Sequence, residues 1–157
     1  MGAVVMHVGL TVSDVGRSRR FYEETFGFSH DRELRLPPER LQALMALDPP
    51  SHIHAVYLML GGLTLELMAF DPAAEACAAG RVFNQTGLAH LSIAVDEMDA
   101  ALARARANGG TVLARAGRAA MLRDPDGVLI ELVDKAVHDD VERGRSQRAA
   151  DGAPAPR

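Results

Sequence analysis

The chain repeats one pattern of strand and helix, and this repeat restricts the folds that it can adopt. The segment Met6–Phe28 corresponds to Ala89–Val112, because each opens near a His, continues as an apolar β-rich run, reaches an acidic residue and then becomes helical. The segments Gly61–Asp71 and Pro125–Lys135 also correspond, since each places a Gly-containing turn before a strand with the sequence Leu-Glu-Leu or Ile-Glu-Leu. Such a duplication predicts two similar supersecondary units.

Each copy is predicted to run β-α-β-β-β, which makes the chain an α+β protein of two paired modules. Ser13 and Asp14 can cap the first helix, and Asp96 can cap the second. Gly27 can end the first helix, and a run of Asn and two Gly from Asn108 can end the second.

An insertion and a tail interrupt the symmetry of the two copies. The first copy is 18 residues longer between His7 and Glu66 than the second is between His90 and Glu131. The extra segment is bounded by Pro pairs, and the end of the chain is charged and then rich in Ala, Gly and Pro. The predicted organisation is a first module over residues 1–75 with a helical insertion at about 35–52, a linker over 76–87, a second module over 88–137, and a disordered tail over 138–157.

The composition narrows the class of protein. No window approaches about 18 uninterrupted apolar residues, and the N-terminus lacks the basic region of a secretory signal, so we expect no membrane partner. Cys77 is the single cysteine, which suits a reducing cytoplasm. A net charge of −4 and the absence of Trp argue against nucleic acid as a partner. We therefore expect a cytoplasmic protein that acts on a small molecule.

Two His and two Glu occupy equivalent places in the two copies. His7 and His90 begin the first strands, and Glu66 and Glu131 lie inside otherwise apolar last strands. A carboxylate in such a strand is costly to bury unless a partner compensates it. Two imidazoles and two carboxylates suit Zn²⁺, Ni²⁺, Mn²⁺, Co²⁺ or Fe²⁺. The repeat therefore predicts one divalent metal ion bound by these four side chains, with a purely structural polar cluster as the alternative.

The chain resembles the vicinal oxygen chelate superfamily, which includes glyoxalase I, methylmalonyl-CoA epimerase, extradiol dioxygenases, and the fosfomycin and bleomycin resistance proteins. The resemblance covers nearly all of residues 4–135 and is carried by the segments His7–Phe28, Leu63–Phe70, Gly87–Gly110 and Arg123–Asp134. It implies that the paired βαβββ modules form an open, cupped mixed sheet around a divalent metal. It also implies the ligands His7, Glu66, His90 and Glu131, the same set that the repeat predicts.

The resemblance implies chemistry in which the metal chelates two vicinal oxygens of the substrate and stabilises negative charge there. Glu66 as a fourth ligand favours a glyoxalase I type lyase or isomerase working through an enediolate or enolate. Glu131 or Glu66 is the catalytic base, and the resemblance points to Glu131. The alternatives are an Fe(II)-dependent extradiol-type dioxygenase with a triad of ligands, and a metal-free, ligand-sequestering protein of the bleomycin resistance type.

The expected partners are a small-molecule substrate with vicinal oxygens and a second copy of the chain, because members of this superfamily commonly form homodimers. The sequence leaves open whether the four ligands come from one chain or two. It also leaves open whether a thiol cofactor such as glutathione or CoA is used, since none of the arginines falls in an assignable motif.

Overall fold

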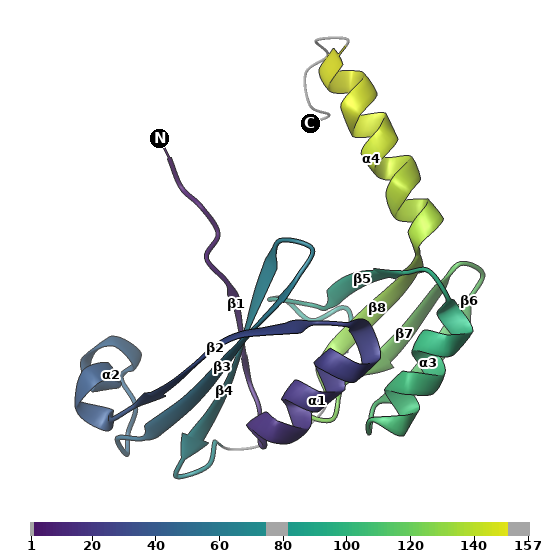
Figure 1. The fold of residues 1–157 in the computed structure, drawn as a ribbon. Helices are drawn as coiled ribbons and strands as arrows, with labels where there is room; N and C mark the ends of the chain where they lie inside the picture. Colours follow the sequence, from purple (N-terminus) through teal and green to yellow (C-terminus); the bar gives the residue numbers. More distant parts are fainter. Residues whose placement is uncertain (1, 75–81, 151–157) are drawn as a thin grey trace.

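The computed structural model describes residues 2–74 and 82–150, which form two modules of the same strand and helix order (Figure 1). The first module contains β1 (Val8–Thr11), α1 (Val15–Phe26), β2 (Ser29–Leu36), the inserted α2 (Pro38–Met45), β3 (His52–Leu60) and β4 (Leu63–Asp71). The second contains β5 (Leu91–Val95), α3 (Met98–Ala107), β6 (Thr111–Ala116), β7 (Ala119–Arg123) and β8 (Leu129–Asp134), followed by α4 (Lys135–Ala150). The predicted α+β class and duplicated βαβββ unit are confirmed. Cys77 and part of the predicted linker lie outside the described residues.

The two modules have the same sheet topology. The strand orders are β1-β4-β3-β2 and β5-β8-β7-β6, and in each sheet the first strand pairs in parallel with the last. Gly9 is opposite Glu66 in the first sheet, and Ser92 is opposite Glu131 in the second. Among the described strands, β1 and β5 are edges of two separate four-stranded sheets, so one chain does not join them into a single sheet.

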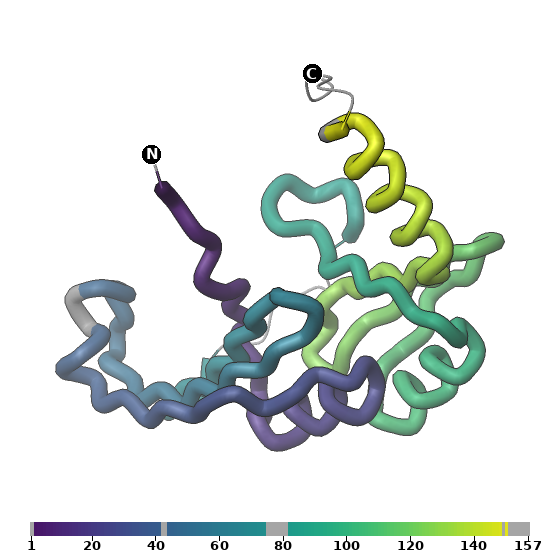
Figure 2. Tube along the Cα trace, turned by 45° about the horizontal axis from the view of Figure 1, so that its top comes forward, coloured from purple at the N-terminus to yellow at the C-terminus, as the bar shows by residue number. Residues whose placement is uncertain are grey.

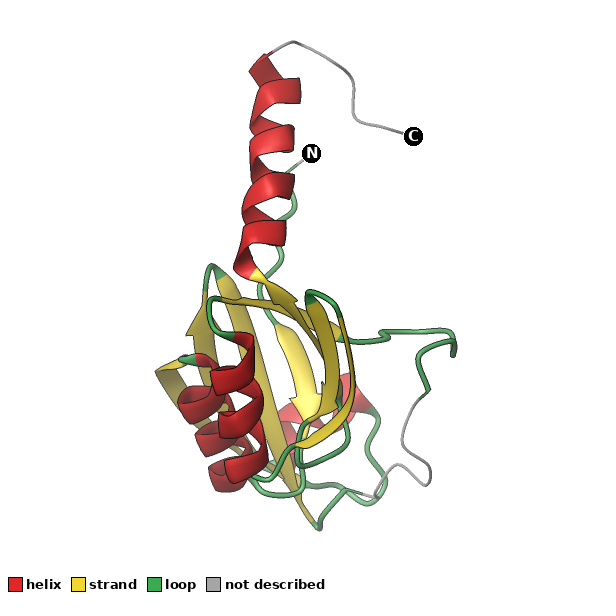
Figure 3. Cartoon of the chain, turned by 90° about the vertical axis from the view of Figure 1, so that its right-hand side faces the viewer, coloured by secondary structure: helices red, strands yellow, loops and turns green. Residues whose placement is uncertain are grey.

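Both modules share one hydrophobic core, and α1 and α3 lie side by side within it (Figure 3). Leu10 and Ile93 are buried in this core, as strand alternation predicts for the side of each sheet that faces a helix. Ala101, Leu102 and Ala105 of α3 lie on one face of the helix and are buried. Each fully buried Leu or Ile contributes about 1.5–3 kcal/mol relative to exposure. The opposite faces of the sheets are left for His7, Glu66, His90 and Glu131.

The two ends of α1 and the C-terminus of α3, where Asn108 is the C-cap, follow the sequence signals, and only the N-terminus of α3 departs from them. The Asp14 side chain accepts a hydrogen bond of 2.9 Å from the Arg17 amide, and Gly27 ends α1 with φ of 80°. The prediction that Asp96 caps α3 is wrong, because the N-cap residue is Glu97 and its side chain makes no capping hydrogen bond. Asp96 instead forms an ion pair with Lys135, and the Nζ atom of Lys135 lies 3.2 Å from Oδ1 of Asp96.

The tail differs from the sequence-based expectation. Residues 138–150 were predicted to be disordered, but they continue the helix α4, which projects away from the sheets (Figure 1). Ion pairs of i,i+3 spacing, Arg143 with Asp140 and Arg145 with Glu142, support the helix along its exposed surface. These local ion pairs stabilise a helix that has no buried face. The expectation of disorder, which rests on the lack of such a face, is therefore wrong for residues 138–150. Residues 151–157 lie outside the described residues.

A part-buried polar contact joins one module to the other. Asp126, in the turn between β7 and β8, accepts hydrogen bonds from the Ser13 hydroxyl at 2.6 Å, Arg17 Nη2 at 2.6 Å and the Ser18 hydroxyl at 2.9 Å. Burial alone would raise the pKa of Asp126, but the hydrogen bonds from Ser13, Arg17 and Ser18 outweigh burial and lower that pKa below its usual value. Nearby, the Tyr22 hydroxyl donates a 2.9 Å hydrogen bond to Asp124.

Replacing Asp126 tests this contact. Asp126→Asn should lower the free energy of unfolding by about 1–3 kcal/mol at neutral pH, because Arg17 and two hydroxyls lose an ionised acceptor. The wild-type carboxylate, with its lowered pKa, contributes stability above about pH 4 and loses this contribution as the pH falls through its folded-state pKa. The difference between variant and wild type in urea unfolding should therefore shrink in acid. The control Asp99→Asn removes the partner of Arg115 from a side chain that is 83% exposed, and should change stability by less than about 0.5 kcal/mol. Equal losses for both variants would contradict the assignment.

A close approach at Gly110 gives a second prediction. A Cβ at this position would lie 2.8 Å from Cε2 of Phe21 and 3.0 Å from the carbonyl oxygens of Ala105 and Arg123. Gly110→Ala should therefore cost about 1–3 kcal/mol in urea unfolding, because the crowded atoms include backbone that cannot move independently. Gly144→Ala is the control, since its Cβ would meet nothing nearer than 3.6 Å. A Gly110→Ala protein as stable as wild type would show that the two modules are not packed closely at this point.

Candidate metal centre

The first module brings His7 and Glu66 together. His7 lies directly before β1, whose residue Gly9 is opposite Glu66 of the parallel neighbour β4. The Nε2 atom of His7 is 3.0 Å from Oε2 of Glu66, and their side chains are 36% and 11% exposed. We call these two residues the module-1 pair. The other carboxylate oxygen, Oε1, accepts a hydrogen bond from the hydroxyl of Tyr57 on β3.

The second module brings His90 and Glu131 together in the equivalent place, and we call them the module-2 pair. His90 Nε2 lies 3.6 Å from Glu131 Oε2, and the Ser92 hydroxyl donates a 2.8 Å hydrogen bond to the same oxygen. The ring of Phe83 stacks on His90 with centroids 4.8 Å apart. The Nδ1 atom of His90 is buried without a hydrogen-bond partner among the described residues.

Within one chain the four predicted ligands form two separate pairs. Across residues 2–74 and 82–150, no group of three or more His, Cys, Asp or Glu side chains is placed to bind a metal ion. The structure thus brings together each predicted His with the Glu of its own module, but it does not bring the two pairs to one point.

The spacing inside each pair fits metal ligands. Donor atoms bound to one metal at about 2.1 Å lie about 3.0–3.5 Å from each other in octahedral or tetrahedral coordination. The separations of 3.0 Å in the module-1 pair and 3.6 Å in the module-2 pair are close to that range. Each pair also offers one imidazole nitrogen and one carboxylate oxygen, which is the donor set expected for a divalent ion of the first transition series.

The surroundings of the two carboxylates differ. Glu66 is almost fully buried at 9% exposure, and the ring of Tyr57 beside it is buried as well. Burial, and then the hydrogen bond to Glu66, raise the pKa of Tyr57. The Tyr57 hydroxyl therefore stays protonated at neutral pH and donates a hydrogen bond to the carboxylate. Glu131 is more accessible, with 32% of its side chain exposed.

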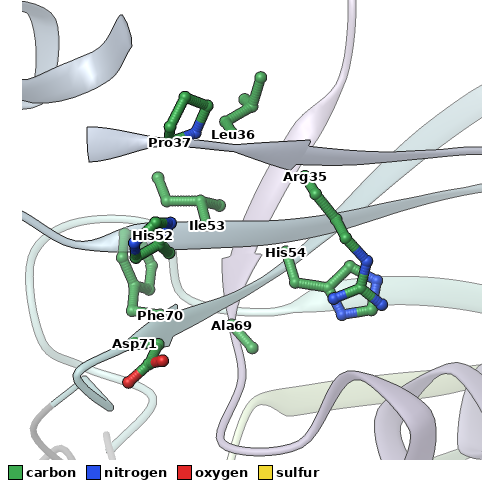
Figure 4. A pocket seen from close by; sticks show the side chains of 9 residues that line it. All are labelled: Arg35, Leu36, Pro37, His52, Ile53, His54, Ala69, Phe70 and Asp71. Atoms are coloured by element: carbon green, nitrogen blue, oxygen red, sulfur yellow. The ribbon is translucent and has the colours of Figure 1, made fainter. Parts of the chain in front are cut away.

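Hollows adjoin two of the predicted ligands, and one of about 140 Å³ is lined by Glu131 together with Met121 and Ala114. A hollow of about 240 Å³ is lined by His90 together with Leu10, Thr11 and Leu129, so it opens where the first module meets the second. A larger hollow of about 540 Å³ lies at the ends of β2, β3 and β4 and includes Arg35 and His54 (Figure 4). It contains none of the four predicted ligands, so we do not assign it to the metal centre.

Three polar residues at these sites were not assigned a role from the sequence. These residues are Tyr57, Ser92 and Asp126. A signal for Tyr57 was available, because a two-residue turn at Gly61–Gly62 sets the hairpin register that places Tyr57 opposite Glu66. No comparable local signal links Asp126 to α1, since that contact depends on how the modules pack.

Comparison with known proteins identifies the family of the chain. The sequence profile described as Glyoxalase/Bleomycin resistance protein/Dioxygenase superfamily matches residues 4–132. The chain belongs to this superfamily. The resemblance to the vicinal oxygen chelate proteins and the fold that it implies are therefore confirmed.

Individual relatives are distant. The chain is 24% identical over 145 residues to a lactoylglutathione lyase from Haemophilus influenzae, a match that covers 83% of this chain and 91% of that protein. A glyoxalase family protein from Bacillus cereus has a TM-score of 0.72 at 16% identity, covering 83% of this chain and 92% of the other. The trypanothione-dependent glyoxalase I from Leishmania major has a TM-score of 0.64 at 22% identity, covering 96% and 99%.

The fold also occurs in a resistance protein. The fosfomycin resistance protein FosX from Mesorhizobium loti has a TM-score of 0.59 at 20% identity, covering 85% of this chain and 92% of the other. At these identities the structural matches establish the fold, and the chemistry must be argued from the side chains. None of the helices in the described part of the chain is long and apolar enough to cross a membrane.

Proposed function

We propose that this chain is a divalent-metal-dependent lyase or isomerase of the glyoxalase I type, acting on a small molecule with vicinal oxygens. The observation that carries the proposal is the presence of two His–Glu pairs, each with the spacing of metal ligands, at equivalent places in the two modules. The distant similarity to a lactoylglutathione lyase supports the same reaction class.

We further propose that two copies of the chain complete each site. The module-1 and module-2 pairs lie apart within one chain, and the edge strands β1 and β5 have no strand neighbour on their outer sides among the described strands. Unpaired strand edges favour association with another chain. The extended arm before β1, visible in Figure 2, also exposes Val4, Val5 and Met6 to 86%, 86% and 71%. An exposed apolar segment beside an open edge is typical of an interface.

In such a site His7 and Glu66 of one copy and His90 and Glu131 of the other would bind the metal. When bound, the divalent ion supplies positive charge that stabilises the negative charge developing on the substrate oxygens. Glu131 is the better candidate for the base that removes a proton next to a carbonyl. It is more exposed than Glu66, and its Oε1 accepts no hydrogen bond from the described residues, whereas Tyr57 occupies Oε1 of Glu66.

The position of Glu66 bears on the dioxygenase alternative. A triad of ligands would leave Glu66 without a role, yet this carboxylate is buried and lies 3.0 Å from His7 Nε2. Its burial is best explained if a cation compensates its charge. We therefore favour a site with four ligands over the three-ligand site of a dioxygenase.

Mixing two inactive variants tests both the site and its assembly. One variant is His7→Ala/Glu66→Ala and the other is His90→Ala/Glu131→Ala, so each lacks one pair. Refolded or co-expressed together, they should recover about one quarter of the wild-type metal content and activity, because random pairing makes half the dimers mixed and each mixed dimer has one intact site of two. Metal content is measured by elemental analysis, and activity by thioester formation from a 2-oxoaldehyde and a thiol.

The controls for the mixing experiment are each variant alone, which should bind no metal tightly. Recovery of neither metal nor activity on mixing would contradict a site shared between copies. Wild-type protein that binds no divalent ion after EDTA treatment and re-addition of metal would overturn the proposed function and favour the metal-free binding alternative.

Glu131→Gln tests the base. The variant should lose about 10²–10⁴-fold in kcat, because an amide cannot accept the proton, while the protein keeps its fold. The matched control is Glu142→Gln on α4, which removes only the exposed partner of Arg145 and should leave kcat unchanged. A Glu131→Gln protein with kcat within a few-fold of wild type would assign the base to another residue.

A further inference from the structure

We propose that Tyr57 is a positioning residue that fixes Glu66 as a rigid metal ligand. The other carboxylate of the shared site, Glu131, is then the one that can move toward a substrate. The inference rests on the proposed function and deepens it. It concerns this chain's own side chains, which are arranged in a row across the first sheet.

The row is set by strand register. Gly9 on β1 is opposite Glu66 on β4, Glu66 is opposite Tyr57 on β3, and Tyr57 is opposite Arg32 on β2. Residues directly opposite each other project from the same face of a sheet, so these side chains are neighbours. The guanidinium carbon of Arg32 lies 3.9 Å from the centre of the Tyr57 ring, at cation–π distance.

The contacts in this row restrain Glu66 from several sides. Tyr57 donates its hydroxyl hydrogen to Oε1, and its ring meets the imidazole of His7 edge-on at 5.8 Å. A Cβ at Gly9 would lie 3.0 Å from Cε of Met68 and 3.6 Å from Oε2 of Glu66, so the missing side chain leaves the room that this arrangement uses. With Oε1 occupied, Glu66 presents only Oε2 beside His7 Nε2.

The second module lacks this restraint. Met121 takes the place opposite Glu131 that Tyr57 takes opposite Glu66, and Ala114 takes the place of Arg32. A thioether cannot donate a hydrogen bond to a carboxylate. The hydroxyl near Glu131 belongs instead to Ser92 and binds Oε2, the oxygen nearer to His90. Glu131 therefore keeps Oε1 free of hydrogen bonds within the described part of the chain.

The difference assigns the roles. A carboxylate fixed by a buried hydrogen bond loses little further conformational freedom on binding a cation, so it contributes to affinity. A carboxylate with a free oxygen and an accessible side chain can turn toward a substrate carbon. Tyr57 thus makes the module-1 pair the rigid ligands of the metal, whereas Glu131 of the module-2 pair stays free to change its conformation.

The test is cobalt binding by the metal-free full-length protein. Tyr57→Phe keeps the ring and removes only the hydroxyl, and it should weaken Co²⁺ binding about 10–100-fold, as is usual when a hydrogen-bond partner of a metal ligand is lost. It should also change the visible absorption of the bound Co²⁺, because a released Glu66 can coordinate through both oxygens. Met121→Leu, at the equivalent place in the second module, should leave the affinity within about twofold and the spectrum unchanged.

A double-variant cycle separates positioning from general stability. In a Glu66→Gln background, Tyr57→Phe should lower the Co²⁺ affinity by less than about twofold, because the hydroxyl acts through the carboxylate. Equal Co²⁺ affinity and spectrum for Tyr57→Phe and wild type would overturn the inference and leave the proposed function intact, as would an undiminished effect of Tyr57→Phe in the Glu66→Gln background. Wild-type protein that does not bind Co²⁺ at all would overturn the proposed function and this inference with it.

Discussion

The packing of the two modules over one shared core, with Asp126 bonded to the start of α1, is the constraint on which the rest of the structure depends. One carboxylate in the second module accepts hydrogen bonds from two hydroxyls and a guanidinium of the first, over a core that both modules share. With the modules fixed in this way, each sheet turns its His–Glu pair away from the helices. The two pairs therefore stay separate within the described part of one chain.

The duplicated fold also allowed the two pairs to diverge. Both modules place a His before the first strand and a Glu in the last strand, which preserves the donor set. The neighbouring strand, however, presents Tyr57 in one module and Met121 in the other. A single position opposite each carboxylate can therefore decide whether that carboxylate is rigid or free to turn, without altering the ligands.

The helix α4 and the arm before β1 are two segments that lie outside the duplicated modules. Neither belongs to the repeat, and both extend beyond the two sheets (Figure 1). The helix is stabilised by ion pairs between close neighbours in the sequence, such as Arg145 with Glu142. The arm exposes Val4 and Val5, which are apolar.

The sequence by itself determined the two βαβββ units, the α1 caps and the identity of the four candidate ligands, because these depend on strand alternation, capping chemistry and a repeat that are all local. Even the partnership of Tyr57 with Glu66 follows from the length of one turn. Only the tertiary structure decided that Asp126 joins the modules and that His7 lies with Glu66 but apart from His90. Those facts depend on how two preformed units pack against each other, and the packing is set by many weak contacts between residues about 100 positions apart in the chain.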